Sequence, residues 1–168
     1  MRYNRWMAEL VVLVGLQASG KTSFYRAHFA ETHVHVSKDL LRNNRRPERR
    51  QRVLIREALA AGRNVVVDNT NSTREQRAPL IAIGREFGAR IIAWYLESTV
   101  ADSVRRNRLR EGRARIPDVG IYATAARLEP PALEEGFAEI HRVRMVESAA
   151  QDSPEFVVES TTDPSSGR

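Results

Sequence analysis

The segment Gly15–Thr22 constrains the fold of this chain more than any other, because it reads GLQASGKT and matches the spacing GxxxxGK[ST]. It follows Leu10–Val14, a run of leucine and valine that is typical of a buried strand. The pattern of Lys21–Ala30 favours a helix. A glycine-rich turn between a strand and a helix presents backbone N–H groups and the positive end of the helix dipole to an anion. The sequence therefore predicts a phosphate-binding loop.

The residue types in this loop suit a nucleoside triphosphate. Lys21 would bridge the β- and γ-phosphates, and Thr22 would offer its hydroxyl to Mg²⁺. Lys21 and Lys38 are the only lysines among 27 basic residues, and a long, compact point charge suits this task better than an arginine fork. We therefore expect ATP and Mg²⁺ to bind here, with the nucleotide contacted by Gly15, Gln17, Ala18, Ser19, Gly20, Lys21 and Thr22.

The rest of the chain alternates between strand and helix patterns. Strands are predicted at His33–Ser37, Asn64–Asp68, Arg90–Leu96 and the end of Phe137–Val146, and helices at Pro47–Ala61, Thr73–Phe87, Val100–Arg110 and Asp118–Arg127. This alternation predicts an α/β fold with a central parallel sheet flanked by helices. The phosphate-binding loop indicates the P-loop NTPase class. We expect one such domain over residues 1–146 and a flexible polar tail over 147–168, in which Phe156–Val158 could be extended.

Composition excludes several other classes. The 168 residues suit one domain, and the absence of cysteine excludes a disulfide framework, an iron–sulfur cluster and a thiol nucleophile. The four histidines lack the spacing of a zinc enzyme. No apolar run is long enough to span a bilayer and no signal peptide is evident, so we expect a cytoplasmic protein without membrane contact. The net charge of +6 fits a polyanionic partner.

A carboxylate ends the second predicted buried strand. Asp68 follows the run Val65–Val67, as in a Walker B strand, and ligands of parallel sheets bind beyond such strand ends. Asp68 could hold Mg²⁺ or orient a group of the site, although any strand can end in a capping Asp. Asn69 follows it in a polar loop, where it could contact a substrate or serve only the turn.

Asp39 follows the predicted strand His33–Ser37 and so lies at the same sheet edge as the phosphate-binding loop. A kinase needs a carboxylate there, to accept the proton of the attacking hydroxyl and aim that hydroxyl at the γ-phosphorus. A helix cap would explain Asp39 equally well. Seven arginines follow within fifteen residues, and they form either a solvated helix face or a surface that tracks nucleic-acid phosphates: Arg42, Arg45, Arg46, Arg49, Arg50, Arg52 and Arg56.

A second arginine cluster lies in Val104–Arg115, which contains six arginines. Arg106 and Arg110 are four residues apart and would share one helical face. Two such arginines on a lid can close over ATP phosphates and stabilise charge on the group in transfer. A charged, exposed helix is the alternative explanation.

Together these motifs resemble the kinase domain of the 5′-hydroxyl polynucleotide kinases, as in the phage and animal end-healing enzymes of the P-loop kinase superfamily. The resemblance covers Leu10 to Met145, and its motifs are GLQASGKT, HVHVSKD, NVVVDNTN, VRRNRLRE, the Ile116-Pro117 step and PALEEGF. It differs in Ser37, where the family often has Asn.

The resemblance implies the kinase type of the P-loop NTPase fold with an arginine-bearing lid, and a phosphotransferase that phosphorylates the 5′-hydroxyl end of DNA or RNA. It implies that Asp39 is the general base, that Arg42 contacts the acceptor phosphate and that Asp68 lies beside the metal and the acceptor. Arg106 and Arg110 would be lid arginines on the nucleotide. Without a DxD motif, no accompanying phosphatase activity is expected. A kinase of a small hydroxylated metabolite and an ATP-binding regulatory protein remain alternatives.

Overall fold

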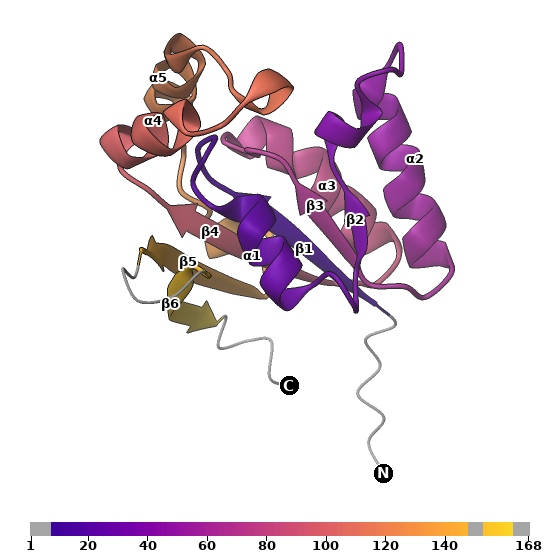
Figure 1. Cartoon of the computed structure of the whole chain (residues 1–168). Helices are drawn as coiled ribbons and strands as arrows, with labels where there is room; N and C mark the ends of the chain where they lie inside the picture. The colour runs from indigo at the N-terminus through magenta and orange to yellow at the C-terminus, as the bar shows by residue number, and fades with distance from the viewer. Residues whose placement is uncertain (1–7, 148–152, 163–168) are drawn as a thin grey trace.

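The computed structural model describes residues 8–147 and 153–162 of the chain. Its six-stranded sheet has the order β2-β3-β1-β4-β5-β6, in which the first five strands are parallel and β6 is antiparallel to β5 (Figure 1). The strands are β1 (Glu9–Val14), β2 (Val34–Val36), β3 (Val65–Asp68), β4 (Arg90–Glu97), β5 (Glu139–Val146) and β6 (Glu155–Thr162). The helices are α1 (Lys21–His28), α2 (Pro47–Ala60), α3 (Arg74–Glu86), α4 (Val100–Arg108) and α5 (Asp118–Arg127), with 3-10 turns η1 (Lys38–Leu41), η2 (Gly112–Ala114) and η3 (Leu133–Glu135).

Helices cover both faces of the sheet, which explains why β1 and β3 are apolar at every position but their ends. Leu10 and Val12 of β1 pack in the same cluster as Ile55 of α2 and Leu80 of α3. Val11, on the other face of β1, lies in a second cluster with residues of α1 and β5. Each fully buried aliphatic side chain of this kind contributes about 1.5–3 kcal/mol to stability. The α/β fold with a mainly parallel sheet is therefore confirmed.

The helix boundaries agree with the sequence patterns except at some C-terminal ends. The oxygen of Thr73 caps α3 by accepting from the Gln76 amide, at 3.2 Å. The first helix ends at His28, two residues before the predicted end. The helix predicted over Val100–Arg110 ends at Arg108, so Arg110 lies beyond it. That difference moves Arg110 off the helical face that it was expected to share with Arg106.

Part of the segment expected to be a flexible tail forms a strand, which contains the stretch Phe156–Val158 that was expected to be extended. Glu155–Thr162 forms β6, which pairs with the whole of β5, and the register places Val158 opposite Val143. Most β6 side chains are exposed, so the strand lacks the alternation of buried and exposed residues that marks a strand in sequence. Phe156 is the exception, because its ring lies 5.0 Å from that of Phe24 in α1. The domain boundary at residue 146 remains a prediction.

The loops that follow β1, β2 and β3 all lie at the carboxyl ends of these parallel strands, on the same side of the sheet (Figure 1). The α4–α5 segment follows β4 and returns to β5. Within the described ranges, no helix combines the length and the apolar composition that crossing a membrane requires.

Candidate active site

The phosphate-binding loop joins β1 to α1 and depends on two of its glycines. Gly20 has φ +100°, and a Cβ at this position would lie 2.9 Å from the sulfur of Met145. A Cβ on Gly15 would lie 2.7 Å from the carbonyl oxygen of Leu96. The Gly15 amide donates to the carbonyl of Thr70 at 3.0 Å, which ties the loop to the segment after β3. Neither glycine can therefore be replaced without moving the loop.

Lys21 is buried at the start of α1. Its ammonium donates to the carbonyl of Gly15 at 3.0 Å and to that of Leu16. Burial lowers the pKa of Lys21 from 10.5 to about 8, and Arg110 acts in the same direction, whereas the Asp68 and Asp39 carboxylates oppose it. Lys21 thus lies close to all three of these charged side chains.

Thr22 and Asp68 form a hydroxyl–carboxylate pair, as the two motifs predict. The Thr22 hydroxyl donates to Oδ2 of Asp68 at 3.0 Å, although 46 residues separate them in the chain. His35 Nε2 lies 3.0 Å from the same oxygen, and its ring stacks on Tyr25 with the centroids 3.9 Å apart. The sequence patterns assign no role to His35, because its contact with Asp68 crosses from β2 to β3.

Asp39 lies on η1, directly after β2. Ser37 caps this turn by accepting from the Asp39 amide at 3.3 Å, so the helix cap is Ser37 and not Asp39. The Asp39 side chain is 80% exposed, and its Oδ1 accepts from the Arg42 guanidinium at 3.0 Å. The carboxylate is therefore accessible, with Arg42 beside it.

Both polar atoms of the Asn69 side-chain amide form hydrogen bonds. Its Oδ1 accepts from the backbone amide of Lys38 at 2.9 Å, and its Nδ2 donates to the buried Gln51 at 2.7 Å. Asn69 thereby connects the end of β3 to the turn that carries Asp39 and to α2. Sequence reasoning missed Gln51, since a lone Gln on an arginine-rich helix carries no signal.

The two arginines expected to form a lid lie in different places. The half-buried Arg110 lies near Asp39 and Asp68, and partial burial lowers the pKa of its guanidinium while those carboxylates oppose the change. Arg106 donates through Nε to Glu147 at 3.0 Å and through NH1 to Ser98 at 3.3 Å. The prediction of one shared helical face is wrong, because α4 ends before Arg110 and the chain turns there.

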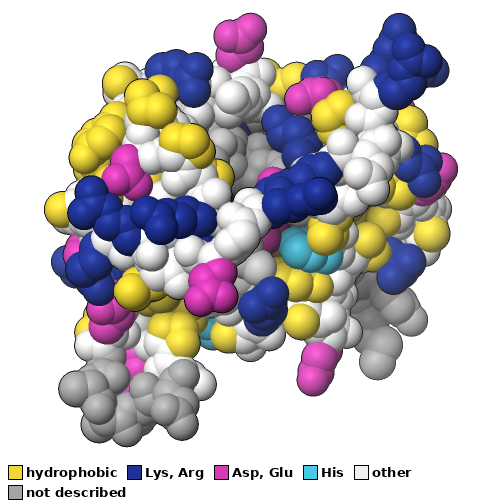
Figure 2. Space-filling view, turned by 45° about the horizontal axis from the view of Figure 1, so that its top comes forward, with side chains coloured by type: hydrophobic (Ala, Val, Ile, Leu, Met, Phe, Trp, Pro, Cys, Tyr) yellow, Lys and Arg dark blue, Asp and Glu magenta, His cyan; other side chains and the backbone are white. Residues whose placement is uncertain are grey.

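One cavity, of about 780 Å³, brings most of the predicted residues together. Figure 2 shows this face of the molecule, on which Lys and Arg side chains gather beside a hollow. Arg26 and Lys38 also line the cavity, and neither was predicted to belong to the site. The cavity is lined by Gln17, Ala18, Lys21, Thr22, Ser23, Arg26, Lys38, Asp39, Arg42, Asp68, Asn69, Thr70, Arg110, Ala114 and Ile116.

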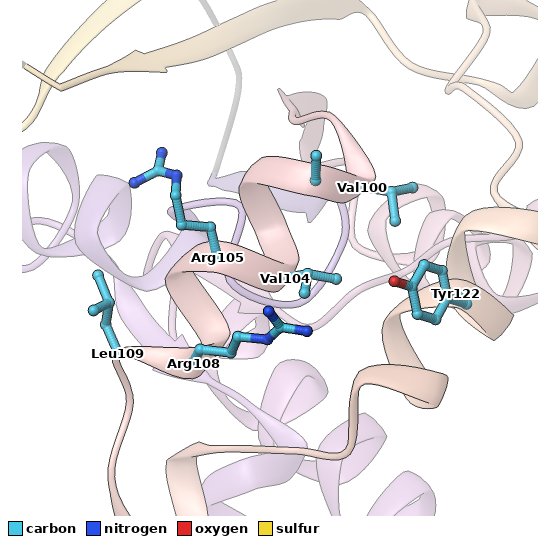
Figure 3. Close-up of a pocket in the computed structure, with 7 residues that line it drawn as sticks. Val100, Val104, Arg105, Arg108, Leu109 and Tyr122 are labelled. Carbon is cyan, nitrogen blue, oxygen red and sulfur yellow. The ribbon is translucent and has the colours of Figure 1, made fainter.

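Two further cavities lie on the α4 side. Arg106 lines one of about 450 Å³ with Met145 and Glu147, and Met145 is the residue that packs against Gly20 of the loop. The other, of about 640 Å³, lies between α4 and α5 and is lined by Val104, Tyr122 and neighbouring residues (Figure 3). No predicted site residue lines this third cavity.

Comparison with known proteins agrees with the P-loop motif and the fold. A family model described as AAA domain matches residues 10–131. Among curated proteins, the chain is 30% identical over 139 residues to a bifunctional polynucleotide phosphatase/kinase of Schizosaccharomyces pombe. That match covers 80% of this chain but 33% of the relative, so the chain spans about a third of the relative's length.

Solved structures share the fold at low sequence identity. Kti12 of Chaetomium thermophilum, in complex with ADP-AlF3, superposes with a TM-score of 0.66 at 16% identity, over 84% of this chain and 92% of that one. A gluconokinase from Sinorhizobium meliloti 1021 superposes with a TM-score of 0.53 at 22% identity, over 76% of this chain and 78% of that one. The fold is therefore shared with proteins of different function.

Proposed function

Because the chain belongs to the AAA domain family, we propose that it is a P-loop kinase that transfers the γ-phosphoryl group of ATP to the 5′-hydroxyl end of DNA or RNA. The observation that carries this proposal is that the side chains a kinase needs line one and the same cavity. The phosphate-binding lysine, the Thr22–Asp68 pair, the exposed carboxylate of Asp39 and the guanidinium of Arg110 all line it. A water-hydrolysing ATPase more often orients its water with Gln or Glu, whereas an aspartate at this position suits the acceptor hydroxyl of a kinase.

In the proposed reaction, the acceptor hydroxyl attacks the γ-phosphorus of ATP. Asp39 accepts the hydroxyl proton, the new bond forms between acceptor oxygen and phosphorus, and the bond from phosphorus to the β,γ-bridging oxygen breaks. ADP leaves with that electron pair. Lys21 and the loop amides hold the phosphates, and Arg110 stabilises the negative charge that spreads over the transferring group.

Thr22 and Asp68 fit a Mg²⁺ ion. The hydroxyl and the carboxylate supply only oxygen, which magnesium prefers, and they lie 3.0 Å apart at the wall of the cavity. Magnesium sites in such enzymes use one or two protein ligands and complete their shell with water and phosphate. Within the described ranges, no group of three His, Cys, Asp or Glu side chains forms an alternative metal site. When bound, Mg²⁺ would neutralise charge on the β- and γ-phosphates.

The position of Arg106 supports a contact with the nucleoside part of ATP. Its cavity is also lined by Met145, which packs against Gly20, so this cavity adjoins the phosphate-binding loop. We propose that Arg106 contacts the nucleoside there while Arg110 contacts the phosphates.

The acceptor is proposed from the charge of α2 and from the curated relative. Arg42 and Arg56 are paired with Asp39 and Glu86. Five other arginines at this end of the molecule are exposed and form no ion pair within the described residues: Arg45, Arg46, Arg49, Arg50 and Arg52. Unpaired arginines beside Asp39 suit the phosphates of a polynucleotide. The matched polynucleotide phosphatase/kinase supports the same acceptor.

Transfer of label from γ-labelled ATP tests this proposal. The acceptors are a 5′-hydroxyl DNA oligonucleotide, the corresponding RNA, a 3′-mononucleotide, gluconate as a small hydroxylated metabolite, and none. We expect label on an oligonucleotide, none with the Lys21→Ala variant, and a transfer rate lower by a factor on the order of 10² or more with Asp39→Asn. Label on the metabolite alone would favour the small-molecule kinase, and ATP binding without any transfer would favour a regulatory protein.

Removing charge at and just before the start of α2 should weaken acceptor binding selectively. We expect the triple variant Arg45→Ser, Arg46→Ser, Arg49→Ser to lose affinity for a 5′-hydroxyl oligonucleotide and about two units of the salt-dependence slope, because each lost phosphate contact removes roughly 0.7–0.9. ATP binding should not change. The control triple Arg63→Ser, Arg85→Ser, Arg127→Ser removes the same charge outside the cavity. Equal losses in both triples would show a nonspecific charge effect.

A further inference from the structure

Arg77 on α3 is a fully buried cation that lines none of the cavities described above. Its side chain has no solvent exposure. A guanidinium carries five N–H donors and cannot lose its charge in a protein, so burial is costly unless those donors are satisfied. Four hydrogen bonds satisfy four of these donors here, and they reach three places in the chain: η3, the loop after β3 and the end of α5.

The first segment is the 3-10 turn before β5. Nε and NH2 of Arg77 donate to the two carboxylate oxygens of Glu135, both at 2.8 Å. This bidentate geometry orients the guanidinium plane. Glu135 is fixed in turn, because its Oε1 also accepts from the Ala132 amide at 3.0 Å.

The second pair of bonds goes to main-chain oxygens. NH1 of Arg77 donates to the carbonyl of Asn71 and to the carbonyl of Glu129, each at 2.9 Å. Glu129 lies just after α5, where the segment that carries Arg110 returns to the sheet. Asn71 lies in the loop between β3, which ends at Asp68, and α3. One side chain thus holds both segments in a fixed relation.

Asn71 connects this cation to the phosphate-binding loop. Its backbone has φ +42°, in the left-handed region, which asparagine adopts more readily than most residues. Its Nδ2 donates to the carbonyl of Leu13 in β1 at 2.8 Å, and the preceding carbonyl, of Thr70, accepts from the Gly15 amide. Two hydrogen bonds therefore transmit the position of residues 70–71 to the start of the phosphate-binding loop.

From these contacts we propose that Arg77 is a positioning residue for nucleotide binding, which holds residues 68–71 and the first glycine of the phosphate-binding loop in place. The inference rests on the proposed function in that ATP is taken as the nucleotide. It does not depend on which acceptor is used.

The test separates positioning from stability. Arg77→Lys keeps the charge but loses the planar fork, and its three N–H donors on one nitrogen cannot make all four bonds, which spread over three guanidinium nitrogens. We expect Kd for ATP to rise about tenfold, and amide hydrogen exchange to accelerate across residues 13–20 and 68–72. Arg74→Lys on the same helix is the matched control, because Arg74 is exposed and only loosely paired with Glu129 and Glu135. It should leave both measurements unchanged.

The double variant Arg77→Met, Glu135→Met removes the buried charges together, which avoids an unpaired charge and regains stability relative to Arg77→Met alone. It cannot restore the bonds to Asn71 and Glu129. We therefore expect the melting temperature to recover while the weak ATP binding persists. Wild-type Kd and wild-type protection in the folded Arg77→Lys or double variant would overturn the proposal. Absence of transfer to any 5′-hydroxyl would overturn the proposed acceptor without affecting these comparisons.

Discussion

Lys21→Met abolishes phosphoryl transfer but stabilises the protein in the absence of nucleotide. This is the expected result, because Lys21 is buried as a cation whose pKa falls from 10.5 to about 8. At about 1.4 kcal/mol per pKa unit, burying this charge costs roughly 3.5 kcal/mol. The lost hydrogen bonds to Gly15 and Leu16 offset part of it. We expect a net gain of about 1–2 kcal/mol at pH 7, measured by chemical denaturation.

The pH dependence of the stability difference between Lys21→Met and wild type tests whether burial of the Lys21 charge is its cause. Between pH 8 and 10.5 the unfolded chain binds the Lys21 proton and the folded chain does not, so this contribution to wild-type stability improves as pH rises. The advantage of Lys21→Met should therefore be full below pH 8 and disappear toward pH 10.5. Lys38→Met is the control for stability, because Lys38 is the other lysine and its side chain is 37% exposed. A gain of equal size in Lys38→Met would contradict the explanation.

Asp39→Asn should lower kcat by a factor on the order of 10² or more, because the amide cannot accept the proton of the acceptor hydroxyl. Kd for ATP should change little, since the exposed Asp39 on η1 is proposed to contact the acceptor hydroxyl and not the nucleotide. Single-turnover transfer with a 5′-hydroxyl oligonucleotide measures the first quantity, and calorimetric titration with ATP measures the second.

Asp118→Asn is the matched control. Asp118 is also an aspartate hydrogen-bonded to an arginine, Arg108, but it lines none of the three cavities described above. It should leave kcat within about twofold of wild type, as for most surface substitutions. Weak ATP binding with normal kcat in Asp39→Asn would instead assign Asp39 to the nucleotide.

The elements that local patterns specify were predictable. The run Leu10–Val14 and the glycine loop after it indicate a strand, a turn and a helix from neighbouring residues alone. The alternation of strand and helix patterns along the rest of the chain then implies a parallel sheet. Because parallel strands end at one edge, the proximity of Lys21, Asp39 and Asp68 also follows from their positions in sequence. Contact between these motifs therefore needed no knowledge of side-chain geometry.

The expected extended stretch Phe156–Val158 lies within β6, but the full length of β6 and the separation of the two lid arginines were not predictable. An edge strand with two exposed faces has no periodic burial to reveal it, and it exists because β5 offers hydrogen bonds to it. The i, i+4 spacing of Arg106 and Arg110 indicates a shared face only while the helix continues, and α4 ends at Arg108. Where a helix ends depends on the packing around it, which the spacing does not encode.

The sequence by itself therefore determined the P-loop, the α/β class and the edge of the sheet at which the site lies, since each depends on residues adjacent in the chain. Tertiary structure alone decided which side chains support that site. His35 reaches Asp68 across 33 residues, Gln51 reaches Asn69 across 18, and Arg77 reaches Glu135 across 58. Such bonds form between groups that only the completed fold places within reach of each other, so no local pattern can carry them.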